Sequence, residues 1–255
     1  MTGTPVIVVD QVAQRFGART IFREVSFSVA EREVFVILGG SGSGKSTLMK
    51  LLIGLSQPSS GSIEVLGHAT ADPVARGAMR RQIGVMFQSG ALFGSMTLLE
   101  NVMLPLEMFT GLPPEGREAV ARVKLGLVGL GDAAGLMPAE ISGGMARRAG
   151  IARAMALDPP LLFLDEPSAG LDPITSAGLD RLILDLRRDL GATFVVVTHE
   201  LASILAIADR CVMLDRAAFP DAGGLIAEGD PRQLRDTSEQ PTVRAFFRRE
   251  ALEQA

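Results

Sequence analysis

The chain has 255 residues, of which 47% are hydrophobic and 21% are charged, a balance typical of a folded globular protein rather than a disordered one. Its net charge of −4 argues against nucleic acid as the main partner. The longest apolar runs, such as VFVIL and TFVVV, have the length of strands. They predict no membrane span and instead favour a parallel sheet that is buried on both faces.

Two features bear on the compartment in which the chain works. The single cysteine, Cys211, lies in the strand-like run RCVML, which predicts a buried core thiol that forms no internal disulfide. The N-terminal segment MTGTPVIVVDQ lacks the charged region and the long apolar region of a signal peptide. The expected compartment is therefore the cytoplasm.

The first third of the chain is expected to consist mainly of short strands. The segments PVIVVDQVAQRF, VSFSVAEREVFVIL and GSIEVLG alternate apolar with polar residues, which is the pattern of half-buried antiparallel strands. Within this third, Val34–Leu38 leads into a glycine loop and then into an expected helix over Lys45–Leu55.

The glycine loop GGSGSGKST matches the pattern G-x-x-x-x-G-K-[ST], so we predict that it binds the phosphates of a nucleotide. Its residues are Gly39, Gly40, Ser41, Gly42, Ser43, Gly44, Lys45, Ser46 and Thr47. Glycines let backbone N–H groups turn towards phosphate oxygens, and the following helix directs its positive dipole end at them. Lys45 is expected to reach the β- and γ-phosphates, and Ser46 to bind Mg²⁺ through its hydroxyl. The alternative, an ordinary glycine-rich turn, is disfavoured by the flanking strand and apolar helix.

The pattern differs over residues of about 89–155, where helical segments are separated by glycines. Two of these segments are LLENVMLPLEMF and EGREAVARVKLGLVGL, and they predict a helical insertion. Gln88 ends a strand where this insertion begins. Its amide oxygen is able to reach Mg²⁺ or an attacking water. We therefore expect Gln88 to act in the site and to lie where the bound nucleotide affects the insertion.

The last third returns to short buried strands, PLLFLDEP and TFVVVTHE, which alternate with helical segments and predict a parallel sheet in an α/β fold. Asp165 and Glu166 end the first of these strands. We predict that Asp165 serves the Mg²⁺ site and that Glu166 polarises the attacking water, the alternative being a helix-capping pair. His199 follows the second strand and is predicted to contact the γ-phosphate, the alternative being a structural role.

Six motifs in order, GGSGSGKST, FQSG, ISGGMARR, LLFLDEP, SAGLD and THE, resemble the ATP-binding subunits of ABC transporters over about residues 5–230. The resemblance implies an ATPase that uses ATP and Mg²⁺. It also implies a P-loop NTPase (RecA-like) core with an N-terminal antiparallel β subdomain and a helical subdomain at about 89–155. Together these would form one ATP-binding domain over residues 5–238.

In this family two subunits pack head to tail, so that the signature loop of one completes the P-loop site of the other. The resemblance therefore implies that Ser142, Gly143 and Gly144 contact the ATP of a second copy. It also implies that Asp172 lies near the interface and couples the two sites. Phe16 stands where the family has an aromatic ring under adenine, the alternative being a core position.

A second likeness concerns one branch of the family. SGGMARR, FQSGALFGSMTLLENVMLPL and the tail QPTVRAFFRREALEQA look like the ATPases of Mla/Mce lipid-transport systems, which work with a transmembrane permease and MCE-type lipid-binding proteins. Met145 replaces the usual glutamine of the signature, which reflects either this branch or neutral drift. The likeness implies a peripheral ATPase on the cytoplasmic face of the bacterial inner membrane that moves phospholipids or other hydrophobic molecules.

The alternatives within the family are ATPases of lipoprotein release or of small-molecule uptake. A more remote alternative is a non-transport ABC ATPase that acts on DNA or ribosomes. The acidic balance and the lack of a coiled-coil insertion or a second cassette argue against that alternative, so no nucleic-acid partner is expected.

Three further groups of residues are candidates for contacts. Arg147 and Arg148 continue the signature helix, where they either favour nearby phosphates or form a solvated face. By resemblance, the segment Leu92–Val102 borders a groove for a coupling helix of the permease; the candidate contacts, each with core packing as alternative, are Phe93, Met96 and Leu98. The polar tail, residues 239–255, is expected to anchor on the partner ATPase subunit through Val243, Phe246 and Phe247, which have helical spacing.

Overall fold

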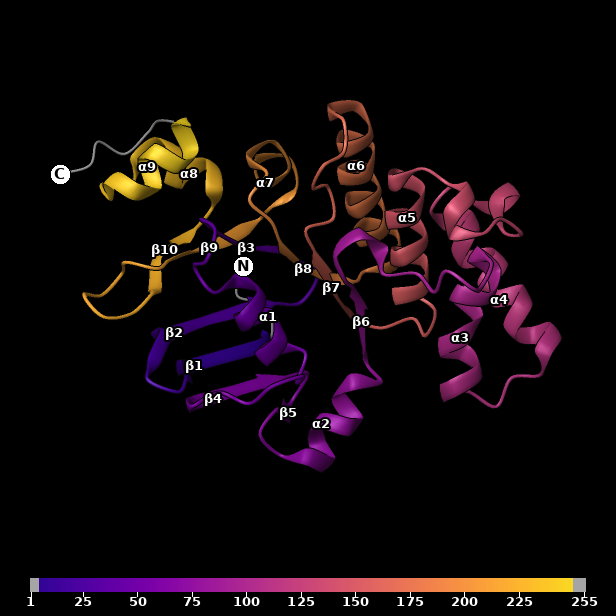
Figure 1. The fold of residues 1–255 in the computed structure, drawn as a ribbon, viewed down its shortest axis with the longest axis horizontal. Helices are drawn as coiled ribbons and strands as arrows, with labels where there is room; N and C mark the ends of the chain where they lie inside the picture. The colour runs from indigo at the N-terminus through magenta and orange to yellow at the C-terminus, as the bar shows by residue number, and fades with distance from the viewer. Residues whose placement is uncertain (1–4, 250–255) are drawn as a thin grey trace.

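The computed structural model describes residues 5–249, which form two sheets flanked by helices (Figure 1). The smaller sheet is antiparallel, with the strand order β2-β1-β4-β5. Its strands are β1 (Pro5–Phe16), β2 (Arg19–Ala30), β4 (Ser60–Val65) and β5 (His68–Ala69). The predicted antiparallel strands of the first third are thus confirmed, with one exception described next.

The larger sheet has six strands in the order β10-β9-β3-β8-β7-β6. They are β3 (Val34–Gly39), β6 (Ile83–Met86), β7 (Leu161–Asp165), β8 (Thr193–Val197), β9 (Arg210–Asp215) and β10 (Gly224–Gly229). All neighbours are parallel except β9 and β10. The α/β prediction is confirmed, but the reading of VSFSVAEREVFVIL as antiparallel strands is wrong for its second half. A turn after Ala30 separates β2 from β3, and the two strands lie in different sheets.

Strand β3 is buried along its whole length because both faces of the larger sheet are covered. Val34, Val36 and Leu38 contribute to a core shared with the helices on one face. The intervening Phe35 and Ile37 contribute to a second core, shared with the antiparallel sheet. The continuous apolar run VFVIL therefore reflects burial on both sides, as expected for a parallel strand.

Within residues 5–249, four α-helices lie outside the helical insertion and the C-terminal segment. They are α1 (Lys45–Leu52), α2 (Pro73–Arg80), α6 (Pro173–Leu190) and α7 (Leu201–Ile207). Three of them follow strands of the larger sheet, and α2 precedes its strand β6. Helix α1 is shorter than expected because the chain turns at Gly54, whose φ of 70° is typical of a residue that ends a helix. Cys211 is buried in β9, as predicted, and burial raises the pKa of its thiol to about 12.

The predicted helical insertion is confirmed and lies at one end of the molecule (Figure 1). It contains α3 (Leu98–Phe109), α4 (Pro114–Leu127) and α5 (Gly143–Ala154), with short 3₁₀ turns at Gln88–Gly90, Gly131–Ala133 and Pro138–Glu140. None of the helices in residues 5–249 has both the length and the apolar character needed to cross a bilayer.

The C-terminal segment forms α8 (Pro231–Thr237) and α9 (Pro241–Arg248). The helical spacing of its apolar residues is confirmed, but these residues are not left exposed, as anchoring on a partner subunit would require. Val243 and Phe247 are buried in the chain's own core, and Phe246 is half-buried against the same core. These side chains are therefore already covered without a partner subunit, which removes the reason for assigning them to an interface. Residues 250–255 of the predicted tail lie outside the described residues.

We predict that Phe247→Ala lowers the free energy of unfolding by about 3 kcal/mol, because it removes a large buried side chain and leaves a cavity. Urea unfolding of the isolated chain measures this loss, with the exposed Arg248→Ala as a control that leaves the midpoint unchanged. An unchanged midpoint for Phe247→Ala would mean that this residue does not pack within its own chain.

Candidate functional site

The predicted catalytic residues meet along one edge of the larger sheet. The P-loop follows β3, and His199 follows β8. Asp165 ends β7 with Glu166 directly after it, and Gln88 follows β6. These four parallel strands are consecutive neighbours in the order β3-β8-β7-β6. Their carboxyl ends therefore place residues that are up to 160 positions apart in the sequence next to one another, at the edge where α/β proteins bind ligands.

The P-loop has a backbone that two of its glycines make possible. Gly39 has a φ of 148°, and a Cβ atom there would lie 2.2 Å from the carbonyl oxygen of Leu214 in β9. Gly44 has a φ of 100°, and a Cβ atom there would lie 2.8 Å from the ring of Phe22. Both contacts are too short for any side chain, so the loop fits tightly between β9 and β2.

Lys45 is the first residue of α1 and lies inside the loop that precedes it. Its Nζ donates hydrogen bonds to the carbonyl oxygens of Gly39, at 2.7 Å, and Gly40, at 3.1 Å. Burial lowers the pKa of the Lys45 ammonium, while the carboxylates of Glu166 and Asp165 act in the opposite direction. The ammonium is therefore close enough to Asp165 and Glu166 to be affected by their charges, as expected of a residue that lies between a phosphate and these acids.

A cavity of about 280 Å³ opens in front of the P-loop, and the start of α1 lies at its wall. Its lining residues are Arg19, Ile21, Gly42, Ser43, Gly44, Lys45, Ser46 and Thr47. The hydroxyl of Ser43 is buried and has no hydrogen-bond partner among the described residues. A loop of backbone N–H groups, a lysine and an unpaired buried hydroxyl is suited to a phosphate chain.

The two acids at the end of β7 differ in their surroundings. Burial, and next the neighbouring Glu166, raise the pKa of Asp165, while Lys45 and Lys50 oppose the shift. Glu166 is held by its N–H, which donates to the carbonyl oxygen of Val197 at 2.8 Å, and has a left-handed φ of 48°. The helix-capping alternative for these acids is wrong, because the residue that caps the next helix, α6, is Asp172.

Glu166 and His199 form a direct pair. The Nδ1 of His199 lies 2.8 Å from Oε1 of Glu166, and the other carboxylate oxygen, Oε2, is buried without a partner among the described residues. The Glu166 side chain is 15% exposed, whereas that of His199 is 54% exposed. The pair thus has a sheltered carboxylate and an accessible imidazole, an arrangement suited to general-base chemistry at the edge of the sheet.

The predicted Mg²⁺ ligands, Ser46, Gln88 and Asp165, offer a hydroxyl, an amide and a carboxylate oxygen. This all-oxygen set fits the preference of Mg²⁺, which is usually bound by one or two carboxylates together with phosphates of the substrate. Residues 5–249 contain no group of three or more His, Cys, Asp and Glu side chains able to hold a metal. The raised pKa of Asp165, beside Glu166, identifies a half-buried acidic position that a cation would stabilise.

Gln88 begins a turn that is attached to the helical insertion. Gly90 packs so closely on α5 that a Cβ atom would lie 2.5 Å from the carbonyl oxygen of Ala146. The guanidinium of Arg153, also on α5, donates to the carbonyl oxygens of Gly90 at 3.0 Å and Ala91 at 2.9 Å. A displacement of Gln88 would therefore be transmitted to α5.

Ser142 is the N-cap of α5, and its Oγ accepts a hydrogen bond from the N–H of Met145 at 3.3 Å. Gly144 packs against α6, where a Cβ atom would lie 2.6 Å from Cγ2 of Thr175. Met145 is half-buried and packs on the main core, where an apolar thioether fits and a glutamine amide would lose hydrogen bonds with water. The structure thus gives Met145 a packing role.

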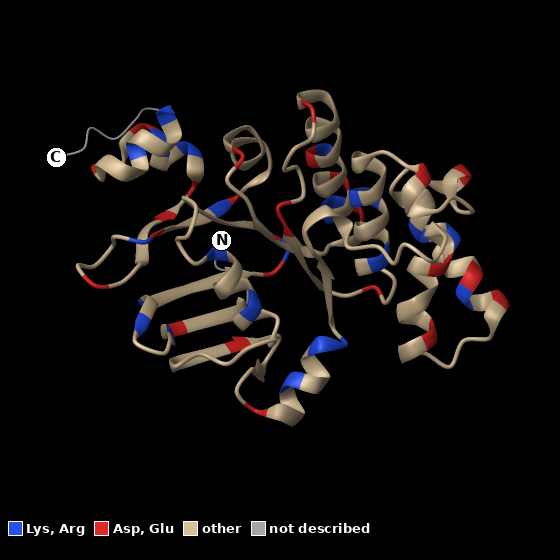
Figure 2. Cartoon of the chain, in the orientation of Figure 1, with Lys and Arg blue, Asp and Glu red and all other residues tan. Residues whose placement is uncertain are grey.

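The solvated-face alternative for Arg147 is wrong, because this side chain is buried and its guanidinium contacts backbone carbonyl oxygens. Arg147 is only 8% exposed, and its guanidinium donates to the carbonyl oxygens of Gly143, at 3.3 Å, and Ala169. Burial lowers its pKa. Arg147 therefore joins the signature loop to the SAGLD segment, a role that no local sequence pattern indicates. Figure 2 shows α5 as a helix marked by basic residues.

Asp172 ends the SAGLD segment and caps α6. Its carboxylate accepts hydrogen bonds from the N–H groups of Ile174 and Thr175, each at 3.0 Å, and from the Thr175 hydroxyl. The Thr175 hydroxyl and then the Thr175 N–H lower the pKa of Asp172. The carboxylate is thus fixed at the surface, where its predicted role at a subunit interface stays a prediction.

The signature residues and the P-loop of one chain do not form a common site. In Figure 1, α5 lies apart from α1, with β7 and β8 between them. No hydrogen bond or ion pair joins Ser142–Gly144 to residues 39–47 within the described part of the chain.

Phe16 ends β1 and is 58% exposed, so the core alternative for this residue is wrong. It pairs with Arg19 across the turn to β2, and Arg19 lines the P-loop cavity. An exposed ring beside the phosphate cavity is placed to stack on a base. Arg19 and the loop after β9 also lie beside this cavity, but no sequence motif marks them, so they were not predicted.

Comparison with known proteins gives consistent results. A family model described as "ABC transporter" matches residues 22–169. The chain is 40% identical over 243 residues, 94% of its length, to the "Probable ribonucleotide transport ATP-binding protein mkl" of Mycobacterium tuberculosis strain H37Rv. It is 40% identical over 232 residues, 90% of its length, to the "Methionine import ATP-binding protein MetN" of Brucella abortus strain 2308. The chain spans 66% of the mycobacterial relative and 61% of the Brucella relative.

A solved structure has a similar fold. It is the dimeric post-hydrolysis state of the ATP-binding cassette MJ0796 bound to ADP and Pi, with a TM-score of 0.77 and 30% sequence identity. The similarity covers 88% of this chain and 98% of that one.

We predict that Phe16→Ala raises the Kd for ATP about tenfold, because one stacking contact with the base is lost. Calorimetric titration measures this change. Phe16→Tyr keeps the ring and should bind ATP normally, and both variants should bind tripolyphosphate, which has no base, like the unmodified chain. An unchanged Kd for ATP in Phe16→Ala would remove Phe16 from the base site.

Proposed function

The chain belongs to the ABC transporter family as an ATP-binding domain of the ATPase type, and we propose that it powers a bacterial transporter of phospholipids or other hydrophobic molecules. One observation supports ATP hydrolysis in this proposal: Lys45, Asp165 and the Glu166–His199 pair lie together at the carboxyl ends of neighbouring strands. The cargo is inferred from the resemblance of the signature, the FQSG segment and the tail to the Mla/Mce branch.

Hydrolysis would use the chain's own groups as follows. The P-loop N–H groups and Lys45 bind the phosphate chain, and Phe16 supports the adenine. Glu166 accepts the proton of a water whose oxygen bonds to the γ-phosphorus, while the bond from that phosphorus to the β–γ bridging oxygen breaks. His199, paired with Glu166, would contact the γ-phosphate through its exposed face. Mg²⁺ held by Ser46, Asp165 and Gln88 would neutralise charge on the β- and γ-phosphates.

A head-to-tail dimer would complete each site. The signature residues Ser142, Gly143 and Gly144 lie at the N-terminus of a 12-residue helix, with the first two exposed. This end of α5 has no phosphate to bind within its own chain, and a second copy would bring one to it. The dimeric form of MJ0796, at 30% identity, supports this assembly. ATP would then hold the two copies together until it is hydrolysed.

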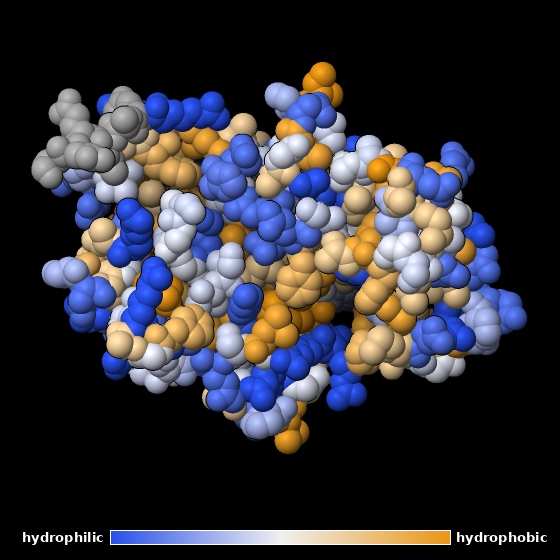
Figure 3. All heavy atoms as spheres, in the orientation of Figure 1, coloured by the Kyte–Doolittle hydropathy of each residue, from blue (hydrophilic) through white to orange (hydrophobic). Residues whose placement is uncertain are grey.

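A groove between the core and the helical insertion offers a site for the permease. Its cavity, of about 150 Å³, is lined by Arg80, Phe109 and Arg153 among others. Figure 3 shows apolar atoms gathered on the face between β6 and α3. Of the contacts expected from the sequence, Phe93 is exposed, Met96 is half-buried, and Leu98 is wholly buried in the core and is therefore excluded.

The remaining partners follow from the lipid-transport proposal. The chain would be bound peripherally to its permease at the cytoplasmic face of the inner membrane, in a complex that also contains an MCE-type lipid-binding protein. Small-molecule uptake is the second candidate, and the names of the mycobacterial and Brucella relatives favour it, since they refer to ribonucleotide transport and methionine import.

We expect Glu166→Gln to bind ATP, to hydrolyse it at least about a hundredfold more slowly, and to accumulate as a dimer, because the amide cannot accept the proton of the attacking water. Phosphate release and size-exclusion chromatography with ATP measure the two effects. The exposed Glu115→Gln on α4 is the matched control. Turnover at the normal rate in Glu166→Gln would exclude Glu166 as the general base.

To test the cargo, we would purify the tagged chain gently from its native membranes and identify the accompanying proteins and lipids by mass spectrometry. The expected result is a permease, an MCE-domain protein and bound phospholipid. A permease without an MCE protein and without lipid would favour small-molecule uptake and would overturn the lipid proposal, while leaving the ATPase chemistry intact.

A further inference from the structure

The loop between β9 and β10, residues 216–223, is attached to the antiparallel sheet beside the P-loop. The N–H of Gly223 donates to the carbonyl oxygen of Ile21 at 3.0 Å, and the N–H of Arg23 donates to the carbonyl oxygen of Gly223 at 3.1 Å. Phe22 and Gly223 thereby form an isolated bridge between β2 and this loop. The backbone of the loop is thus fixed relative to the strand that packs behind Gly44.

Side chains strengthen the same attachment. Nη2 of Arg23 lies 3.2 Å from Oδ1 of Asp221, and the guanidinium of Arg23 lies 4.4 Å from the centre of the Phe219 ring. The N–H of Ala217 donates to Oδ1 of Asp215 at 2.7 Å, which orders the start of the loop. Arg23 is therefore neutralised within the loop, and Asp221, the only acid in residues 216–223, is occupied by it.

A cavity of about 320 Å³ lies between this loop, the start of β2 and the P-loop. It adjoins the phosphate cavity, since both are lined by Arg19, Ile21 and Gly42. The remaining wall consists of Thr20, Arg216, Ala217, Phe219, Pro220, Asp221, Ala222 and Gly223. The loop after β9 thus extends the nucleotide site in a direction that the P-loop alone does not cover.

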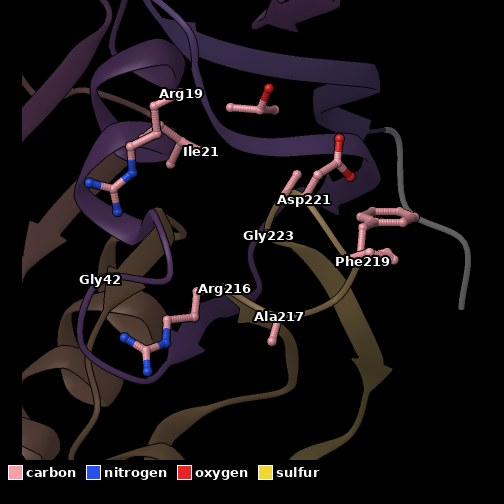
Figure 4. Close-up of a pocket in the computed structure, with 11 residues that line it drawn as sticks. Arg19, Ile21, Gly42, Arg216, Ala217, Phe219, Asp221 and Gly223 are labelled. Atoms are coloured by element: carbon pink, nitrogen blue, oxygen red, sulfur yellow. The ribbon is translucent and has the colours of Figure 1, made fainter.

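Two cations line this cavity and lack acidic partners. Neither Arg19 nor Arg216 forms a side-chain hydrogen bond or an ion pair with any of the residues 5–249, and both are exposed. Figure 4 shows both guanidinium groups on the Gly42 side of the cavity, while Asp221 and Phe219 lie on the other side. Two unpaired arginines that flank a phosphate loop create a positive field that an anionic group would balance.

The position of these arginines indicates which anionic group they would bind. Lys45 and the start of α1 serve the β- and γ-phosphates, and Phe16 is the predicted support for the base. Arg19 lies between these regions, because it pairs with Phe16 across the turn and lines the phosphate cavity. The part of the nucleotide next to Arg19 is therefore the α-phosphate. The planar fork of a second arginine is suited to the same phosphate.

We propose that Arg216, presented by the loop of residues 216–223, binds the α-phosphate of the nucleotide together with Arg19 and so sets nucleotide affinity. This assignment rests on the proposed ATP site. An α-phosphate contact and a γ-phosphate contact predict different effects on the affinities for ATP and ADP. ATP and ADP share the α-phosphate, so both should lose affinity equally when Arg216 is changed, whereas loss of a γ-phosphate contact would affect ATP alone.

The test is calorimetric titration of the full chain with ATP and with ADP in the presence of Mg²⁺. Arg216→Ala should raise both Kd values by the same factor, about five- to tenfold, as expected for a partly exposed charged contact. Arg216→Lys, which keeps the charge without the fork, should lose less. Asp221→Asn, which breaks the ion pair that holds the loop, should reproduce part of the loss. Arg235→Ala on α8, which pairs with Asp236 away from the cavity, is the control and should bind both nucleotides normally.

The outcomes separate this inference from the proposed function. Normal binding by the unmodified chain with unchanged Kd values for Arg216→Ala would overturn the role of Arg216 alone. A loss confined to ATP would overturn its assignment to the α-phosphate. An unmodified chain that binds neither nucleotide would refute the ATP site itself, and with it this assignment.

Discussion

Burial of β3 on both faces is the constraint on which the rest of the site depends. Its alternating side chains enter two different cores, and its neighbours β8 and β9 hold it by parallel pairing. The strand ends at Gly39, which packs directly on the backbone of Leu214. The phosphate loop therefore starts from a point whose position is fixed by pairing, packing and a steric limit at once. The predicted catalytic side chains gain their positions from the same sheet, because they lie at the ends of neighbouring parallel strands.

Much of this site could be predicted from the sequence because its parts are local and the fold rules connect them. A glycine pattern identifies the P-loop, and acids or amides at strand ends converge when the strands are parallel neighbours. The sequence-based predictions that proved wrong concern residues whose surroundings are set by distant parts of the chain. Arg147 and Phe247 stand among polar residues in the sequence, which suggests a surface position, but tertiary contacts bury both side chains. The turn that separates β2 from β3 was not predicted, because apolar residues continue on both sides of it. The contacts that decide these cases lie far apart in the sequence.

Two connections meet on α5. The turn that begins at Gln88 is tied to this helix through Gly90 and Arg153, and the SAGLD segment is tied to it through Arg147. One connection comes from the predicted Mg²⁺ ligand and the other from the segment that follows Glu166. The signature helix is thus linked to both sides of the catalytic edge by hydrogen bonds to backbone carbonyl oxygens.

These connections imply an uneven distribution of local stability around the nucleotide. Opening β3 would expose two cores together, so its backbone can separate only at a cost approaching that of global unfolding. The Gln88–Ala91 turn is mostly exposed, and Ala91, with a φ of 45°, is already in a sparsely populated conformation. A rearrangement there exposes little apolar surface and therefore requires little free energy. The free energy of nucleotide binding would therefore be converted into motion at the turn and the helix attached to it, while the P-loop acts as the stationary reference.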